Sequence, residues 1–132
     1  MKMQATGSLN WKEVIQNCSA ATHSSVDSAE DEQDLSKVNF DIDLYDVYTK
    51  GFLEGADGAL TEAEQEYMPW GAKLMTLECG IRFLTDYLEG DHYFHTQRDG
   101  QNLDRCRTQF KLVRDMEQQW DAMQDVVKKY AR

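Results

Sequence analysis

The sequence is poor in the residues that form turns: it has one proline, Pro69, and eight glycines among 132 residues. A protein built from many short β-strands needs such residues at frequent intervals, so their scarcity favours a few long helices. Cysteine is scarce as well, and the three cysteines, Cys18, Cys79 and Cys106, form no CxxC pair. This pattern argues against a disulfide framework or a zinc site and fits the reducing cytoplasm.

Long hydrophobic runs are also missing. No apolar run approaches the roughly 20 residues that span a bilayer, and residues 1–9 lack the apolar core of a signal peptide. We therefore expect a soluble, cytoplasmic protein without a membrane partner. Its content of 41% hydrophobic and 29% charged residues is typical of a single globular domain.

Basic residues are outnumbered, because 14 lysines and arginines face 24 acidic residues and the net charge is −10. Nucleic acids and anionic membranes attract proteins through lysine and arginine, so we expect neither as a partner. The acidic excess lies in the N-terminal half, and such clusters are usually solvated surface. Between residues 27 and 46 only Lys37 is basic, whereas eight residues are acidic: Asp27, Glu30, Asp31, Glu32, Asp34, Asp41, Asp43 and Asp46.

The chain divides into a weakly patterned segment, residues 1–27, and a helical domain, residues 28–132. In the first segment Trp11, Val14, Ile15 and Cys18 recur at helical spacing after Asn10, a residue type that caps helices. One short helix is therefore predicted there, followed by a loop rich in serine and threonine.

The helical domain is predicted to open with an amphipathic helix. Acidic residues Asp41 and Asp43 stand near its start, where the helix dipole favours them, and we expect Gly55 and Gly58 to end it. Its apolar stripe consists of Phe40, Leu44, Val47, Tyr48 and Phe52.

The next two helices are predicted from a capping box and a proline. Thr61 and Glu64 have the spacing of a capping box, which indicates a helix start. The residue before a proline avoids helical angles, so we expect a break before Pro69, with Pro69 in the first turn of the following helix. From Pro69 to Leu88 apolar residues occur nearly all round, which predicts a central, largely buried helix ending at Gly90.

A long final helix is predicted from Asn102, acting as its N-cap, to about Tyr130. Its apolar residues step by three or four positions along one face: Leu112, Met116, Trp120, Met123, Val127 and Tyr130. No strand-like alternation competes with these helices. The predicted fold class is therefore all-α, a helical bundle of three to four main helices.

No complete catalytic site can be assembled from the sequence. There is no GxSxG elbow, no glycine-rich phosphate loop and no HExxH helix, and neither Cys79 nor Cys106 has an evident histidine base. Asp91, His92 and His95 offer metal ligands, but no further ligand stands at a diagnostic spacing, which favours surface or packing histidines. We predict no catalytic, cofactor-binding or metal-binding residues in this chain.

Two groups of charged residues are candidates for binding. Glu78 and Arg82 stand i, i+4 on the most apolar helix and Asp86 continues the row, so these three either line a ligand site or form an internal ion-pair ladder. The second group lies near the start of the last helix, where salt bridges to the acidic N-terminal half are favoured over phosphate contact. Its members are Arg105, Arg107, Lys111 and Arg114.

Four stretches carry a resemblance to a known family: residues 29–38, 48–55, 77–90 (LECGIRFLTDYLEG) and 102–109. Together they resemble the C-terminal helical part of the aminoglycoside-phosphotransferase-like small-molecule kinases, specifically the N-acetylhexosamine-kinase-like branch. Some relatives of that branch carry the label mucin-desulfating. The resemblance runs from about residue 28 to residue 130, most of the chain.

The resemblance implies part of the C-lobe of a protein-kinase-like fold, from an enzyme that transfers the ATP γ-phosphoryl group to a sugar hydroxyl. The family's catalytic aspartate and metal-binding motifs precede the matched segment, and residues 1–27 contain no H-x-D or D-F-G-like motif. ATP and Mg²⁺ are therefore expected only for the complete family enzyme. The helix that carries Arg82 borders the sugar pocket in these kinases, so the resemblance implies a sugar contact for Arg82, with Glu78 and Asp86 next.

Two hypotheses about function follow. In the first, the chain is the substrate-side subdomain of a sugar phosphotransferase, catalytically incomplete on its own and completed by a missing kinase lobe. In the alternative, it is a stand-alone helical interaction module that self-associates or pairs with a separate kinase chain, because surface that once packed against the catalytic core would be exposed.

Overall fold

A computed structural model describes residues 29–132, and the short helix predicted around Trp11 lies outside these residues. In this part of the chain every regular element is a helix and no strand occurs, so the all-helical prediction is confirmed for it. The 3₁₀ helix η1 (Leu35–Lys37) comes first, followed by α2 (Ile42–Ala56), α3 (Glu62–Glu66), α4 (Met68–Glu89), α5 (Gln101–Gln118) and α6 (Trp120–Tyr130).

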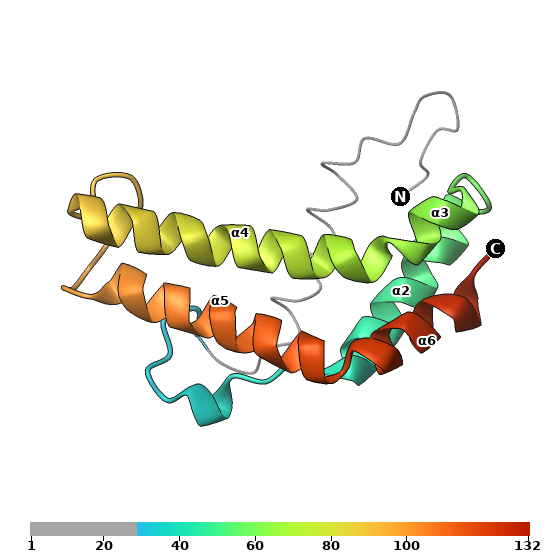
Figure 1. The fold of residues 1–132 in the computed structure, drawn as a ribbon, viewed down its shortest axis with the longest axis horizontal. Helices are drawn as coiled ribbons and strands as arrows, with labels where there is room; N and C mark the ends of the chain where they lie inside the picture. Colours follow the sequence, from blue (N-terminus) through green and yellow to red (C-terminus); the bar gives the residue numbers. More distant parts are fainter. Residues whose placement is uncertain (1–28) are drawn as a thin grey trace.

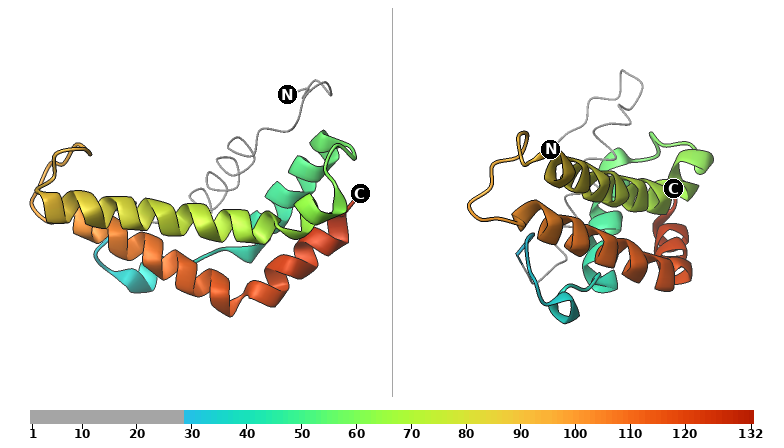
Figure 2. Two further views of the ribbon diagram at one scale, coloured as in Figure 1. Left: turned by 45° about the horizontal axis from the view of Figure 1, so that its top comes forward. Right: turned by 60° about the vertical axis from the view of Figure 1, so that its left-hand side comes forward.

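The helices form an elongated arrangement built on one long hairpin. In Figure 1, α4 and α5 run side by side in opposite directions, joined at the left by the loop of residues 90–100. At the other end the chain bends from α5 into α6, which packs beside α2, with α3 close to both α4 and α6. The further views in Figure 2 show the same bend between α5 and α6.

Several helix ends follow the local sequence signals. The Asp41 carboxylate accepts hydrogen bonds from the backbone amides of Asp43 and Leu44 at the start of α2. Thr61 and Glu64 form the predicted capping box, α4 begins with Pro69 in its first turn, and Gly90 ends it in the left-handed conformation. These predictions are confirmed.

Other helix ends were predicted wrongly. Gly55 lies inside α2, which ends one residue later, and Asp57 and Gly58 take the left-handed conformation that stops it. Asn102 is not an N-cap, because its side-chain amide binds the carboxylates of Asp86 and Asp91 while Gly100 occupies the cap position.

The helix predicted from Asn102 to Tyr130 is two helices, α5 and α6, separated at Gln119. The Gln119 side-chain amide donates to the backbone oxygen of Phe40, 3.2 Å away, at the point where the chain turns toward α2. The predicted apolar face nevertheless points inward in both helices, since Leu112, Met116 and Met123 are almost completely buried. The break at Gln119 thus coincides with a contact to a residue far away in the sequence, which the spacing of apolar residues along the helix does not reveal.

The apolar core lies where α2, α6 and the adjoining ends of α4 and α5 meet. Two adjacent clusters of buried side chains fill it. The larger contains Val38, Phe40, Tyr45, Ala72, Leu112, Met116, Met123 and Val126, and the smaller contains Leu53, Ala56, Leu60, Met68 and Val127.

The prediction that the helix after Pro69 is largely buried was wrong. α4 buries one face, which includes Ala72, Thr76 and Phe83, against α5, but Leu74 and Leu88 are exposed. Within residues 29–132, α5 is the one helix that packs along the length of α4, so only one side of α4 is covered. Apolar residues thus occur nearly all round α4, although the helix does not lie at the centre of the fold.

Candidate functional site

The three charged residues predicted to line a site do not form one row in the structure. Glu78 and Arg82 are exposed on α4, whereas Asp86 is buried, with 4% of its surface accessible. No ion pair joins Glu78 to Arg82 or Arg82 to Asp86 within the described residues. The ion-pair ladder is therefore absent from this part of the chain, and the three residues have separate environments.

Asp86 holds the loop that connects α4 to α5. Its carboxylate oxygens accept hydrogen bonds from the backbone amides of Tyr93 at 2.8 Å and Phe94 at 3.0 Å, and from the side-chain amide of Asn102 at 2.8 Å. Burial by itself raises the pKa of this carboxyl, but these donors, with the amide of His92, outweigh it and hold the pKa below its ordinary value. Asp86 is thus a buried anchor that fixes the position of Tyr93 and Phe94.

Arg82 lies beside the aromatic residues that Asp86 positions. Its guanidinium carbon is 5.5 Å from the ring centre of Tyr93 and 5.6 Å from that of Phe94, and Nη2 donates to the Tyr93 hydroxyl at 3.3 Å. Phe94 in turn packs against the buried ring of Phe83, with 4.7 Å between ring centres. We call Arg82, Tyr93 and Phe94 the tip cluster, since they stand at the loop end of the hairpin.

The tip cluster combines accessible polar groups with an accessible ring. Tyr93 is 73% exposed, and Arg82 is exposed beside it. Guanidinium and phenol groups are strong hydrogen-bond donors, and the phenol also accepts. The arrangement can therefore bind a ligand that offers hydroxyl or carbonyl groups next to an apolar face. Sequence reasoning selected Arg82 but missed Tyr93 and Phe94, which are brought to it by a loop.

A second polar arrangement lies on α5, where the helix contacts residues 29–41. We call residues 29–41 the strap. Five residues of α5 and its C-cap residue, spaced by three or four positions, contact the strap. Asp104 does so through Arg98, and the others do so directly. We call these six residues the polar stripe: Gln101, Asp104, Thr108, Lys111, Asp115 and Gln119. Their spacing places them on one face of the helix. This spacing is a signal present in the sequence, but it was not recognised there as a polar face, and Lys111 alone of the six was named as a candidate.

The stripe binds mainly the backbone of the strap. The Thr108 hydroxyl donates to the Glu30 oxygen at 2.6 Å, and Lys111 Nζ donates to the Val38 oxygen at 2.9 Å. The Phe40 amide donates to Asp115 at 3.2 Å. Because the strap is largely irregular, its backbone groups have few partners of their own, and polar α5 side chains supply them.

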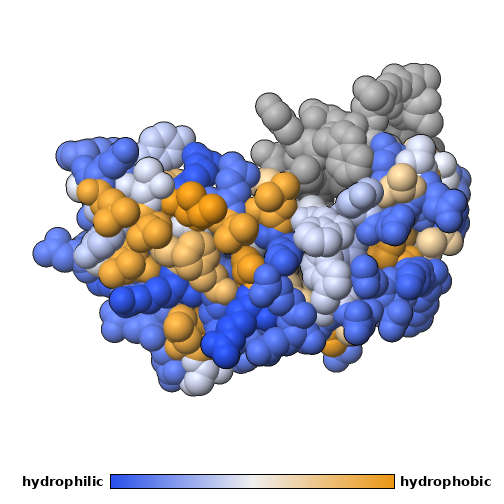
Figure 3. Space-filling model, viewed as in Figure 1, coloured by the Kyte–Doolittle hydropathy of each residue, from blue (hydrophilic) through white to orange (hydrophobic). Residues whose placement is uncertain are grey.

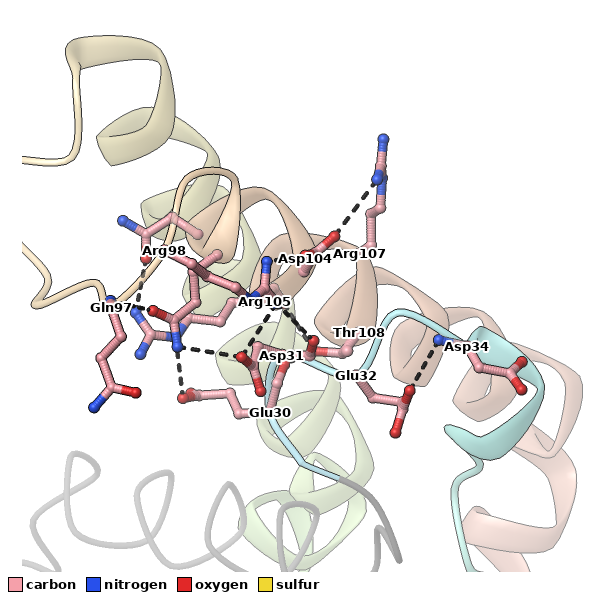
Figure 4. Close-up of polar contacts among 12 residues, drawn as sticks. Glu30, Asp31, Glu32, Asp34, Gln97, Arg98, Asp104, Arg105, Arg107 and Thr108 are labelled. Carbon is pink, nitrogen blue, oxygen red and sulfur yellow. Dashed lines mark hydrogen bonds and ion pairs between the residues drawn. The ribbon is translucent and has the colours of Figure 1, made fainter.

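Figure 4 shows the loop end of this contact, where charged residues from both segments meet. Arg98 lies between two carboxylates, with Nη1 2.6 Å from Asp104 and Nη2 3.2 Å from Asp31. The Nε atom of Arg105 is 3.5 Å from Oε2 of Glu30. Acidic residues of the N-terminal half are thus tied to the hairpin at this end.

The predicted salt bridges of the basic group are confirmed only in part. Arg105 pairs with Glu30 of the acidic segment, but Arg107 pairs with Asp104 and Lys111 with Asp115, both on its own helix. Arg114 forms no ion pair with any residue from 29 to 132. Of the four basic residues, only Arg105 therefore forms an ion pair with the acidic segment within residues 29–132.

Other candidate groups offer little chemistry. His92 and His95 are exposed, and among residues 29–132 no three His, Cys, Asp or Glu side chains are placed to hold a metal ion. Burial raises the pKa of the Cys79 and Cys106 thiols, which disfavours the reactive thiolate. A groove of about 570 Å³ lies between α3 and α6, but its most buried polar residue, Gln65, is bound to the backbone of Arg132 and Leu60.

No model of a known protein family matches the chain. The resemblance to sugar phosphotransferases therefore stays a prediction. Among the described helices none combines the length and apolar character needed to cross a membrane.

Proposed function

We propose that this chain is the substrate-side part of an N-acetylhexosamine-kinase-like sugar phosphotransferase, and that the tip cluster contacts the sugar. The sequence resemblance is the source of the reaction class. The all-helical architecture of residues 29–132 is compatible with part of a kinase C-lobe, and the catalytic groups, ATP and Mg²⁺ belong in this proposal to the rest of the enzyme.

The observation that carries the proposal is the pairing of Arg82 with Tyr93. A pyranose ring presents hydroxyl groups around its edge and an apolar C–H surface on each face. The Arg82 guanidinium and Tyr93 hydroxyl, 3.3 Å apart, supply donors for two neighbouring oxygens, and the exposed Tyr93 ring supplies a surface for the apolar face.

Asp86 has a positioning role in this proposal, because its carboxylate is already occupied by the amides of Tyr93 and Phe94 and by Asn102. It fixes the loop so that Tyr93 remains beside Arg82. Glu78 stands one helical turn before Arg82 and is exposed, so it is a candidate for a further sugar contact at the edge of the same site.

The test is an NMR titration of the full chain with N-acetylglucosamine and with N-acetylgalactosamine. We expect shifts in the amide signals of Arg82, Tyr93 and Phe94 at millimolar sugar, and their loss in Arg82→Ala. Arg114→Ala is the matched control, because Arg114 is also exposed but lies on α5 away from the loop. Binding should be unchanged in that variant.

Absence of shifts at the tip cluster, or equal loss in both variants, would contradict the sugar contact. A separate assay with ATP and Mg²⁺ tests catalytic incompleteness. We expect no phosphorylated sugar from the purified chain, and measurable phosphorylation would overturn that part of the proposal.

A further inference from the structure

α4 carries an apolar face that the other described elements cover only in part: Trp70 packs edge-on against Trp120 of α6, with 4.8 Å between ring centres, and Leu77 and Leu84 are half-buried. Its residues step by three and four positions in strict alternation over six turns, and we call them the α4 seam: Tyr67, at the helix cap, then Trp70, Leu74, Leu77, Ile81, Leu84 and Leu88. None of the seven is charged. An unbroken three-four alternation of this kind is the pattern by which one helix packs along another.

The seam is exposed to an unusual degree. The accessible fractions are 58% for Tyr67, 49% for Trp70, 59% for Leu74, 49% for Ile81 and 74% for Leu88. Figure 3 shows hydrophobic side chains gathered over the α4–α5 hairpin on this face, and Phe110 of α5, 37% exposed, widens the patch. Single exposed apolar residues are ordinary, but a continuous patch along a helix marks a contact surface.

The seam is separate from the face by which α4 binds α5. That inner face contains Ala72, Thr76, Gly80 and Phe83, all buried. At 100° per residue, the seam lies about 130° around the helix from it. α4 therefore has two apolar faces, and within residues 29–132 the hairpin uses one.

We infer that the α4 seam is the interface by which two copies of this chain form a dimer, α4 packing along α4 of the second copy. The six exposed residues of this patch, Phe110 included, leave on the order of 700 Å² accessible, comparable with the roughly 800 Å² that each partner gives to a stable interface. Because both copies present the same face, the contact is isologous and closes at two chains. This inference goes beyond the sugar contact and does not depend on it.

The length of the seam favours a second copy over the chain's own N-terminal segment. From Tyr67 to Leu88 the seam extends about 30 Å, whereas the apolar residues of the helix predicted in residues 11–18 would extend about 10 Å. A helix of that length leaves more than half of the seam uncovered. The α4 helix of a second chain matches the seam over its full extent.

The test is the mass of the full chain by sedimentation velocity and light scattering, from low to high micromolar concentration. We expect twice the chain mass of 15.3 kDa. Ile81→Glu should raise the dissociation constant roughly a hundredfold or more, because it would bury a charge in an apolar contact. Val47→Glu is the matched control: Val47 is 68% exposed on α2, away from the seam, and this variant should remain dimeric.

Circular dichroism confirms that each variant is folded, and Leu88→Glu, at the most exposed seam position, replaces Ile81→Glu if that variant unfolds. The inference is overturned by a single-chain mass at every concentration, which would leave the seam to residues 1–28 or to a different partner. Masses that keep growing beyond two chains also overturn it, since an isologous contact cannot propagate. So does a dimer that Ile81→Glu leaves intact.

Discussion

The two helices of the hairpin distribute their side chains in opposite ways. α5 buries a stripe of polar residues beneath the strap, with Thr108 at 2% and Asp115 at 9% exposure. α4 exposes a seam of apolar residues, with Leu74 at 59% and Leu88 at 74%. The difference shows that burial is set by what packs on a helix face, and that an irregular backbone requires polar side chains under it.

The largest expected effect comes from removing a partner in the polar stripe. Lys111 Nζ is 2.7 Å from Asp115 and 2.9 Å from the Val38 oxygen. Lys111→Met leaves the nearly buried Asp115 carboxylate without its cation, so we expect a loss of about 2–4 kcal/mol in the free energy of unfolding by urea.

Arg114→Met is the control on the same helix, because Arg114 is exposed and unpaired within residues 29–132. Its free energy of unfolding should change by no more than about 0.5 kcal/mol. Equal losses in the two variants would mean that the polar stripe contributes nothing beyond ordinary surface charge, and the contrast between the helices would fail.

The next effect concerns Asp86, the one charged residue among the buried residues of α4. Asp86→Asn removes an acceptor from the amides of Tyr93 and Phe94, so we expect a melting temperature about 5–10 °C lower at pH 7. Glu78→Gln, on the exposed side of the same helix, should shift it by less than about 2 °C.

The Asp86 effect should depend on pH in a defined direction. The pKa of Asp86 is lowered from its ordinary value of 3.8, so its stabilisation is fully present above that value and is lost as the pH falls through the lower native pKa. The difference between wild type and Asp86→Asn should therefore be constant from pH 7 to about 5 and shrink below about 4. A difference that grows on acidification would contradict this role.

The smallest expected effect concerns Gly80, where α4 packs closely against α5. A Cβ atom on Gly80 would lie 2.6 Å from Cε1 of Phe110 and 3.2 Å from Cβ of Gln109, so Gly80→Ala displaces the Phe110 ring and crowds the contact between the two helices. Even after the better helix propensity of alanine, we expect a net loss of about 1 kcal/mol.

Gly51→Ala should change the free energy of unfolding in the opposite direction. Gly51 lies inside α2 and a Cβ there would meet nothing within 4 Å, so alanine should raise the free energy of unfolding by about 0.5–1 kcal/mol. Thermal or urea unfolding of the pair checks both signs. A gain in both variants would show that the contact between α4 and α5 at Gly80 is looser than described.

Local signals predicted the features that depend on a few neighbouring residues. The capping box of Thr61 and Glu64, Pro69 in the first turn of α4 and the stop at Gly90 all follow from short-range hydrogen bonding and backbone geometry. The apolar face of Leu112, Met116 and Met123 was also predicted correctly. The same spacing rule was wrong for part of the α2 stripe, because Leu44 and Val47 are 43% and 68% exposed.

Features that depend on distant residues were not predicted. The break at Gln119 accompanies a contact with Phe40, and the exposure of α4 depends on how many helices pack against it. The candidate site also depends on residues that are distant in the sequence, so only part of it could be predicted. Arg82 was selected from its place on an apolar helix, but Tyr93 comes beside it only because a buried Asp86 holds the loop.

The strap has a consequence for the order of folding. Its hydrogen bonds to α5 and the adjoining loop join residues 67 to 79 positions apart, whereas α4 and α5 are neighbours in the chain. Closing the larger loop costs more chain entropy, so we expect the hairpin to form first and the strap to dock onto it late. During synthesis the strap precedes the helix that receives it, so its backbone groups can gain their α5 partners only after α5 has been made.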